Sequence, residues 1–324
     1  MIYVQLAAGL ALLVVFGDVL VRGAADLSYR LGIPPLIVGL TVVAFGTSAP
    51  ELVVSVKAAL DGLPGIAIGN VVGSNIANIL LVLGLPAIIS ATRCDHHALD
   101  RNTYIVLGTS VLFTGLCFLT PMTFWDGALL FSLLIAFLWL SARRAMRSRP
   151  DGSIVPIEDD VAALPGPIWV SIGALVLGLI GLPVAAHLTV DGASAVARAW
   201  GVSDTVIGLT IVAIGTSLPE LATTLLAAIR QHGALALGNV LGSNLFNMLA
   251  IIGITAMVTP IAIPAEILRL DIWVMLAATV LLVPFVVWQV PIGRIAGIAF
   301  LSAYAVYIGF LLSPGAQAGL AVVR

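Results

Sequence analysis

Long apolar runs alternate with short polar breaks along almost the whole sequence. A membrane-spanning helix needs about 20 consecutive, mainly apolar residues, and ten of the runs approach or exceed that length. The runs are continuous and lack the alternating pattern of membrane β-strands, which excludes a membrane β-barrel. The pattern predicts ten spanning helices, over residues 3–29, 35–58, 65–89, 103–119, 124–142, 167–197, 204–228, 235–257, 271–289 and 293–312.

One longer polar stretch, residues 143–165, separates these helices into two groups of five. Its sequence, RRAMRSRPDGSIVPIEDDVAALP, contains Pro, Gly and charges of both signs. Such a stretch is typical of a loop between two structural units. We therefore expect a first five-helix unit over 1–143, a cytoplasmic linker loop over 144–165 and a second five-helix unit over 166–324.

Charged residues are scarce, which strengthens the membrane interpretation. They make up 9% of the 324 residues, and hydrophobic residues make up 60%, whereas a soluble protein is about 25% charged. So few charges could not cover the surface of a soluble fold of this size. The composition also excludes a disordered chain, a coiled coil, a disulfide scaffold and a nucleic-acid-binding protein. The chain is predicted to be an all-α polytopic membrane protein.

The distribution of Lys and Arg predicts the orientation of the chain in the membrane. If the N-terminus lies outside, ten of the fourteen basic residues fall in cytoplasmic loops or at the helix ends that lead into them. Cytoplasmic loops carry an excess of Lys and Arg in membrane proteins. We therefore expect both termini on the outside and the basic cluster 143–149 in the cytoplasm.

Two sequence blocks occur twice in the chain. Residues 39–52, GLTVVAFGTSAPEL, match 208–221, GLTIVAIGTSLPEL, at 11 of 14 positions, and 69–84 match 238–253 at 9 of 16. Both matches have the same offset of 169 residues, which indicates a duplication. Because each copy has an odd number of helices, the second enters the membrane from the opposite side. The expected fold is ten transmembrane helices as two inverted five-helix repeats, an architecture common in secondary transporters.

Two glutamates, Glu51 and Glu220, lie within apolar helices at matching positions of the two repeats. An ionisable residue inside a membrane helix is costly and suggests a functional site. Pro50 and Pro219 precede them, and each proline leaves the carbonyl four residues earlier without its usual donor. A break of this kind at matching places in two repeats is a typical sign of a transporter binding site.

Helical spacing places further oxygen-bearing residues on the same faces as the two glutamates. Carboxylates, hydroxyls, amides and carbonyls without any histidine or thiol suit hard cations such as Ca²⁺ or Na⁺. Two carboxylates balance the charge of one divalent ion or of two monovalent ions. The residues on the faces of the glutamates are Ala44, Thr47 and Ser48 in the first repeat and Ala213, Thr216 and Ser217 in the second. In the following helices, Ser74 and Asn78 share one face, as do Ser243 and Asn247.

The paired GTSxPE motifs, each followed by GNxxGSNxxN, resemble the two α-repeats of the calcium/cation antiporter superfamily, in its prokaryotic sodium/calcium exchanger branch. The resemblance covers almost the whole chain. It implies a multi-pass protein of a bacterial or archaeal plasma (inner) membrane that exports Ca²⁺ in exchange for Na⁺. It implies no enzymatic activity, no cofactor besides these transported ions, no nucleic acid and no protein partner, so that a monomer in the lipid bilayer would suffice.

The resemblance also implies roles for individual residues. One position departs from the family pattern, because many sodium/calcium exchangers have Asp where this sequence has Asn247. The site then has one ionisable group fewer, which leaves the coupling ion and the stoichiometry open. The implied calcium ligands are Glu51, Glu220, Thr47 and Thr216; the implied sodium ligands are Ala44, Ser48, Ser74, Ala213, Ser217 and Ser243 with the same glutamates; and Asn78 and Asn247 line the site.

Other interpretations of these motifs remain open. The same scaffold could couple Ca²⁺, or another divalent cation, to protons, with Glu51 or Glu220 as the proton carrier. A passive cation channel is disfavoured because the duplicated site lies within one chain. A membrane-embedded hydrolase would need a nucleophile and base near the midplane, and none is apparent. Asn75 and Asn244 could be ligands or could join helices by hydrogen bonds.

The first helix carries charged residues whose role the sequence leaves open. Asp18, Arg22 and Asp26 follow one another at intervals of four residues, a spacing typical of a structural ion pair. His187 and Asp191 occupy the positions that match Asp18 and Arg22 in the second repeat. A gating or proton-transfer role for these residues is the alternative. In the superfamily the first and sixth helices slide together across the others, and the resemblance implies the same here.

Overall fold

The computed structural model describes residues 2–94, 99–119, 121–147, 164–201 and 213–313. Apart from two isolated bridges, the regular structure in these ranges is helical. Seven of its helices are long and apolar enough to cross a membrane, or eight if one bent pair forms a single span. The prediction of an all-α multi-pass membrane protein is therefore confirmed, and the count of ten spans stays a prediction.

The helices of the first half follow the predicted apolar runs closely. The second run is divided into four short helical pieces, and the third contains a π-helical turn. The elements are α1 (Ile2–Leu31), α2 (Pro35–Val38), η1 (Gly39–Val43), α3 (Ala44–Thr47), α4 (Ala49–Leu60), α5 (Pro64–Ala77), η2 (Asn78–Val82), α6 (Gly84–Ile89), α7 (Leu99–Cys117) and α8 (Phe124–Arg147).

The second half repeats this order as far as it is described, except that a further π-helical turn, η5, precedes α15. The predicted run 204–228 begins among residues 202–212, which lie outside the described part of the chain. So do most residues of the predicted linker loop. The elements are α9 (Ile168–Ala199), α11 (Ala213–Gly215), α12 (Leu218–Ile229), α13 (Gly233–Phe246), η4 (Asn247–Ile251), α14 (Ile252–Val258), η5 (Ile267–Asp271), α15 (Ile272–Val287) and α16 (Arg294–Leu311).

The two segments that carry the GNxxGSNxxN motifs form the centre of the molecule. The apolar window of Pro64–Ile89 is 72% buried and that of Gly233–Val258 is 89% buried, whereas the other unbroken candidate spans are at most 33% buried. Glycines allow close approach there. A Cβ atom added to Gly238 would lie 2.5 Å from the Leu36 carbonyl, and one added to Gly39 would lie 2.6 Å from that of Leu235. The small residues of the motifs thus pack α13 directly against α2 and η1.

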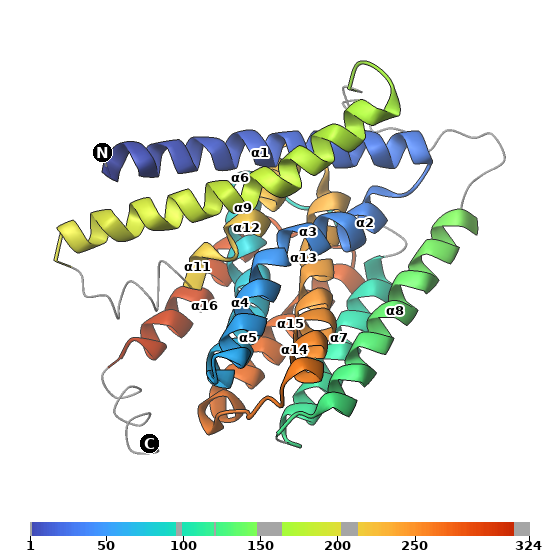
Figure 1. Ribbon diagram of the computed structural model, residues 1–324. Coiled ribbons are helices and arrows are strands. Elements are labelled where there is room, and N and C mark those ends of the chain that lie inside the picture. The colour runs from blue at the N-terminus through green and yellow to red at the C-terminus, as the bar shows by residue number, and fades with distance from the viewer. Residues whose placement is uncertain (1, 95–98, 120, 148–163, 202–212, 314–324) are drawn as a thin grey trace.

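Helices α1 and α9 run side by side across the other helices (Figure 1). Their glycines bring the two backbones together in antiparallel register. A Cβ atom on Gly178 would lie 2.8 Å from the Leu20 Cα, and one on Gly9 would lie 2.7 Å from the Thr189 backbone nitrogen. The pair is therefore a closely packed two-helix unit.

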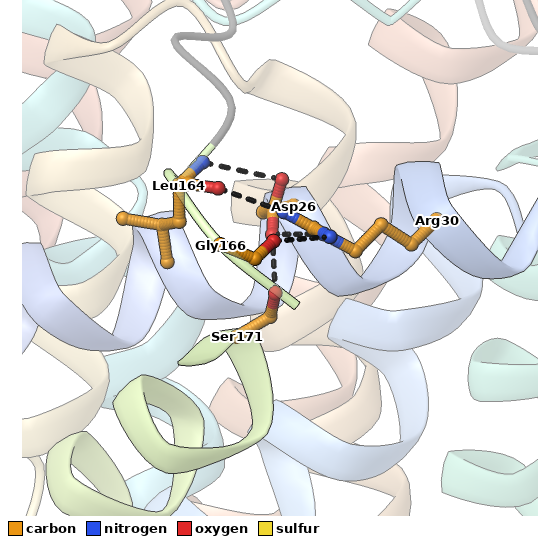
Figure 2. Close-up of polar contacts among 5 residues, drawn as sticks. All are labelled: Asp26, Arg30, Leu164, Gly166 and Ser171. Carbon is orange, nitrogen blue, oxygen red and sulfur yellow. Dashed lines mark hydrogen bonds and ion pairs between the residues drawn. The ribbon is translucent and has the colours of Figure 1, made fainter. Parts of the chain in front are cut away.

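A buried polar cluster fastens α1 to the chain that enters α9 (Figure 2). The Asp26 carboxylate accepts hydrogen bonds from Arg30 Nε at 2.7 Å, from the Leu164 backbone nitrogen at 3.3 Å and from the Ser171 hydroxyl. Arg30 also donates to the carbonyls of Leu164, at 2.7 Å, and Gly166, at 2.9 Å. Asp26 therefore has a complete set of structural partners, and its ion pair lies within α1.

The remaining charged residues singled out on these helices are also paired. Asp18 lies 2.9 Å from Arg22 and forms a second ion pair with Arg230, at the end of α12. The predicted ion pair of Asp18 and Arg22 is thus confirmed. His187 Nε2 lies 3.4 Å from Asp191, and its side chain is 78% exposed, so these two residues face away from the protein interior.

Candidate functional site

The two helices that carry the GTSxPE motifs are interrupted at the serine of the motif. In the first copy α3 ends at Thr47 and α4 begins at Ala49, while Ser48 between them has φ −84° and ψ 3°. Ser217 has nearly the same angles, −87° and 4°, directly before α12. The segments on either side of Ser48 differ in direction by 44°. The prolines that follow lack an N–H and fit the first turn of a helix, so each motif starts a new helix.

The two glutamates lie in the first turns of these new helices. Glu51 and Glu220 are each 1% exposed, and their carboxylates are close enough to interact electrostatically. Ser48 Oγ donates to Glu220 Oε1 over 3.1 Å. Residues from both copies of the motifs therefore meet at one carboxylate.

A pair of asparagines that the sequence analysis did not single out anchors the backbone of both glutamates. Asn70 Nδ2 donates to the Glu51 carbonyl at 3.3 Å and to Ser55 Oγ at 2.9 Å. Asn239 repeats the arrangement. Its Nδ2 donates to the Glu220 carbonyl at 3.5 Å and to the hydroxyl group at the matching position of α12 at 3.1 Å. The signal was present in the sequence, because Asn70 and Asn239 are the second residues of the two GNxxGSN blocks.

The asparagines predicted to line the site each begin a π-helical turn. Asn78 is the first residue of η2 and Asn247 the first residue of η4. The Asn78 carbonyl accepts its hydrogen bond from Leu83, five residues later, at 3.2 Å. Single π-helical turns are frequent at functional sites, since the wider turn changes the direction of side chains. The two turns are again 169 residues apart.

Several oxygen atoms of this region are buried without a hydrogen-bond partner in the described part of the chain. A buried polar atom without a partner costs about 1–3 kcal/mol, so such atoms are uncommon unless a ligand binds them. Five of the eleven atoms of this kind belong to α7, and the other six belong to predicted site residues. These six are Oε2 of Glu51, Oε2 of Glu220, Oδ1 of Asn78, Oδ1 of Asn247, Oγ of Ser217 and Oγ of Ser243.

The other predicted site residues lie on the same segments. The Ala44 carbonyl accepts from the Ser48 nitrogen at 3.0 Å and from the Thr47 hydroxyl at 3.4 Å. Ser74 is buried in α5, and Thr216 is half-buried between α11 and α12. Ala213 begins α11, at the edge of the undescribed residues 202–212.

The chemistry of the site is that of oxygen ligands alone. No group of three or more His, Cys, Asp and Glu side chains gathers anywhere in the described ranges. The buried unpartnered oxygens belong to carboxylates, hydroxyls and amides, which suit hard cations and do not favour zinc or copper. The arrangement could hold one divalent cation, or monovalent cations, between residues of both sequence repeats.

Comparison with known proteins agrees with this chemistry. The family model described as sodium/calcium exchanger protein matches residues 1–143 and 170–313. CaxA of Alkalimonas amylolytica, a proposed antiporter, is 40% identical and covers 85% of this chain and 86% of its own length. The sodium/calcium exchanger MaX1 of Methanosarcina acetivorans is 32% identical, and the match covers 94% of this chain and 97% of MaX1.

The fold is also similar to a solved structure over nearly its whole length. The sodium-calcium exchanger NCX_Mj, soaked with 2.5 mM Na⁺ and 0.1 mM Ca²⁺, superimposes with a TM-score of 0.82 at 33% sequence identity. The match covers 96% of this chain and 99% of that structure. An inner membrane protein of Escherichia coli, YrbG, is 36% identical over 95% of this chain and 97% of its own.

Proposed function

This chain belongs to the sodium/calcium exchanger family, within the calcium/cation antiporter superfamily, and from that membership we propose that it exports Ca²⁺ in exchange for Na⁺. The family consists of transporters rather than enzymes. The observation that carries the proposal is a set of six buried oxygens, from site residues of both sequence repeats and including one from each glutamate, that have no hydrogen-bond partner in the described part of the chain. Ca²⁺ takes six to eight oxygen ligands in proteins.

The proposed ligands follow the residues around the glutamates. Ca²⁺ would bind at the centre, where both carboxylates balance its charge. Na⁺ would bind beside the centre, at hydroxyl and carbonyl oxygens, and would compete for the same carboxylates. The calcium ligands are Glu51, Glu220, Thr47 and Thr216; the sodium ligands are Ala44, Ser48, Ser74, Ala213, Ser217 and Ser243 with both glutamates; and Asn78 and Asn247 line the site.

Transport would follow alternating access at this one site. Ions would enter from one side of the membrane, and the site would then open to the other side. The close packing of α1 on α9 supports motion of these two helices as a unit across the remaining ones. Because Ca²⁺ and Na⁺ need the same carboxylates, occupancy by one would exclude the other, which couples the two fluxes.

The proposed architecture consists of ten spans in two inverted repeats, 1–143 and 166–324, joined by a cytoplasmic loop over 144–165. The helix breaks at Ser48 and Ser217 support it, since they share the 169-residue offset of the sequence repeat. With an odd number of spans in each unit, both termini would lie on the same side of the membrane, and the distribution of Lys and Arg favours the outside of the cell.

The test is ⁴⁵Ca²⁺ uptake into proteoliposomes that contain the purified chain. An outwardly directed Na⁺ gradient should drive accumulation, and a pH gradient of matched free energy should not. Accumulation driven only by the pH gradient would replace the proposal with proton-coupled antiport on the same scaffold. Calcium flux that needs no counter-ion would indicate a channel and would contradict antiport altogether.

A further inference from the structure

Two reciprocal amide hydrogen bonds join the sequence repeats at their centre. Asn78 Nδ2 donates to Asn244 Oδ1 at 3.0 Å, and Asn247 Nδ2 donates to Asn75 Oδ1, also at 3.0 Å. All four side chains are 1% exposed. The bonds lie between η2 and α13 and between η4 and α5, and these π-helical turns also contact the helices that carry the glutamates. The two bonds are equivalent under the 169-residue repeat.

The bonds decide which end of the two site-lining amides is available to an ion. A carboxamide has a donating nitrogen at one end and an accepting oxygen at the other, and only the oxygen can ligate a cation. In both Asn78 and Asn247, the side-chain nitrogen donates its hydrogen bond to an asparagine of the other repeat. Their Oδ1 atoms are left buried and without a donor in the described chain.

A third contact fixes the orientation of Asn244. Its Nδ2 donates to the backbone carbonyl of Asn75 at 3.4 Å. A carbonyl can accept but cannot donate, so Asn244 must turn its nitrogen to this carbonyl and its oxygen to Asn78. Asn78 must then present its nitrogen to Asn244 and its oxygen to the opposite side.

A weaker contact orients Asn75 in the same sense. Its Nδ2 lies 3.7 Å from the sulfur of Met275, on α15. A thioether has no hydrogen to donate and is only a weak acceptor. The Asn75 oxygen is thereby left for Asn247. The two repeats thus differ, because a strong acceptor fixes one amide pair and a weak acceptor fixes the other.

We propose that Asn75 and Asn244 are positioning residues that hold the carboxamide oxygens of Asn247 and Asn78 toward the transported cation. Met275 supports Asn75 in this role. The inference rests on the proposed function, because it assigns the cation as the ligand of these oxygens. It also explains how Asn247 can serve where many relatives of the superfamily have an aspartate: its bond to Asn75 leaves only an oxygen facing the site.

The experiment is a double-mutant cycle on calcium transport by the full chain in proteoliposomes. Asn75→Leu removes the acceptor of Asn247, and Asn247→Ala removes the ligand itself. Each should raise the apparent KM for Ca²⁺ by about tenfold with little change in maximal rate, since the loss of an outer partner of a metal ligand typically costs 10–100-fold in affinity. If Asn75 acts through Asn247, the double variant should match Asn247→Ala alone.

Two further variants make the cycle decisive. Asn102→Leu removes another buried amide, on α7 outside the cluster, and should leave the KM unchanged. Met275→Leu, which removes only the weak acceptor, should raise the KM less than Asn75→Leu and should add nothing in the Asn247→Ala background. If Asn75→Leu does not fold, Met275→Leu provides the test instead. Gel filtration and thermal unfolding check the folding of each variant.

Multiplied effects in the double variant, about a hundredfold in KM, would overturn the positioning role. So would an unchanged KM for Asn75→Leu, or a loss of maximal rate alone. Absence of sodium-driven ⁴⁵Ca²⁺ uptake by the unaltered chain would contradict the proposed function instead. The two failures are therefore distinguishable.

Discussion

Each of the two buried glutamates leaves one carboxylate oxygen unpartnered in the described chain. We expect Glu51→Gln and Glu220→Gln each to abolish calcium transport, lowering it by at least about a hundredfold. A neutral amide in place of one carboxylate leaves a divalent ion half-compensated in a buried site, where water cannot make up the difference. The measurement is sodium-driven ⁴⁵Ca²⁺ uptake.

Glu266→Gln serves as the matched control, because Glu266 lies at the start of η5, outside the cluster. It should transport normally. Thermal unfolding of all three variants shows whether the loss reflects misfolding. Near-normal flux in either of the first two variants would show that the glutamate concerned is structural.

Asn247 places a neutral amide in the proposed site. We expect Asn247→Asp to make calcium transport more sensitive to acid than in the unaltered chain, between roughly pH 6 and 8. A third carboxylate beside two others cannot stay ionised as easily without a bound cation, so protons compete with Ca²⁺ more strongly. The amide of the unaltered residue is neutral throughout this range.

The pH profiles of the two proteins should be measured by calcium uptake at a fixed sodium gradient, with pH equal on both sides of the membrane. Superimposable profiles would place residue 247 outside the ion site. The role proposed for Asn247 would then have to be withdrawn.

At the scale of elements, the contact of α1 with α9 depends on particular glycines. We expect Gly178→Ala to destabilise the protein by about 1–3 kcal/mol, because the added methyl group would lie 2.6 Å from the Leu20 side chain and 2.8 Å from its backbone. The backbone atoms of Leu20 cannot move aside as the end of a flexible side chain can. Thermal unfolding in detergent measures the loss.

Gly173→Ala is the control in the same helix. Nothing lies within 4 Å of a Cβ atom at Gly173, and alanine favours a helix by about 0.5–1 kcal/mol over glycine. This variant should unfold at the same or a higher temperature. Equal unfolding temperatures of Gly178→Ala and Gly173→Ala would show that the packing of α1 against α9 does not depend on close backbone contact.

At the scale of the whole molecule, the proposed inverted repeat and the distribution of Lys and Arg together predict the side of the membrane on which each loop lies. In a variant without Cys94 and Cys117, we expect Gly319→Cys to react with an impermeant maleimide on intact cells and Ser153→Cys not to react. The linker loop would lie in the cytoplasm and the C-terminus outside, as the distribution of Lys and Arg predicts.

In disrupted cells, the cysteine at position 153 should also react with the maleimide, which shows that it is reactive once the reagent can reach it. Labelling of both positions on intact cells, or of position 153 alone, would contradict the proposed orientation.

The sequence predicted the helices and the positions of the two glutamates, but not the contacts between the two repeats. Periodicity and the 169-residue offset placed the helices and the two glutamates, because a duplicated motif is visible without any structure. The bonds of Asn75 and Asn244 could not be predicted, since they join residues far apart in the chain whose distance depends on packing of the two repeats. Two partners of Asp26, Leu164 at the end of the polar stretch and Ser171 in α9, lie more than a hundred residues away in the sequence, which therefore showed its charge and not these contacts.

Those contacts of Asp26 also constrain how the protein can be made. The ribosome releases α1 first and residues 164–171 more than a hundred residues later. Until then only Arg30, on the same helix, can pair with the aspartate, and a charged group within a membrane is costly without its partners. The hydrogen bonds of Asp26 in α1 are therefore complete only once the start of α9 has been made. The N-terminal half alone therefore lacks two of the hydrogen-bond partners that Asp26 has in the full chain.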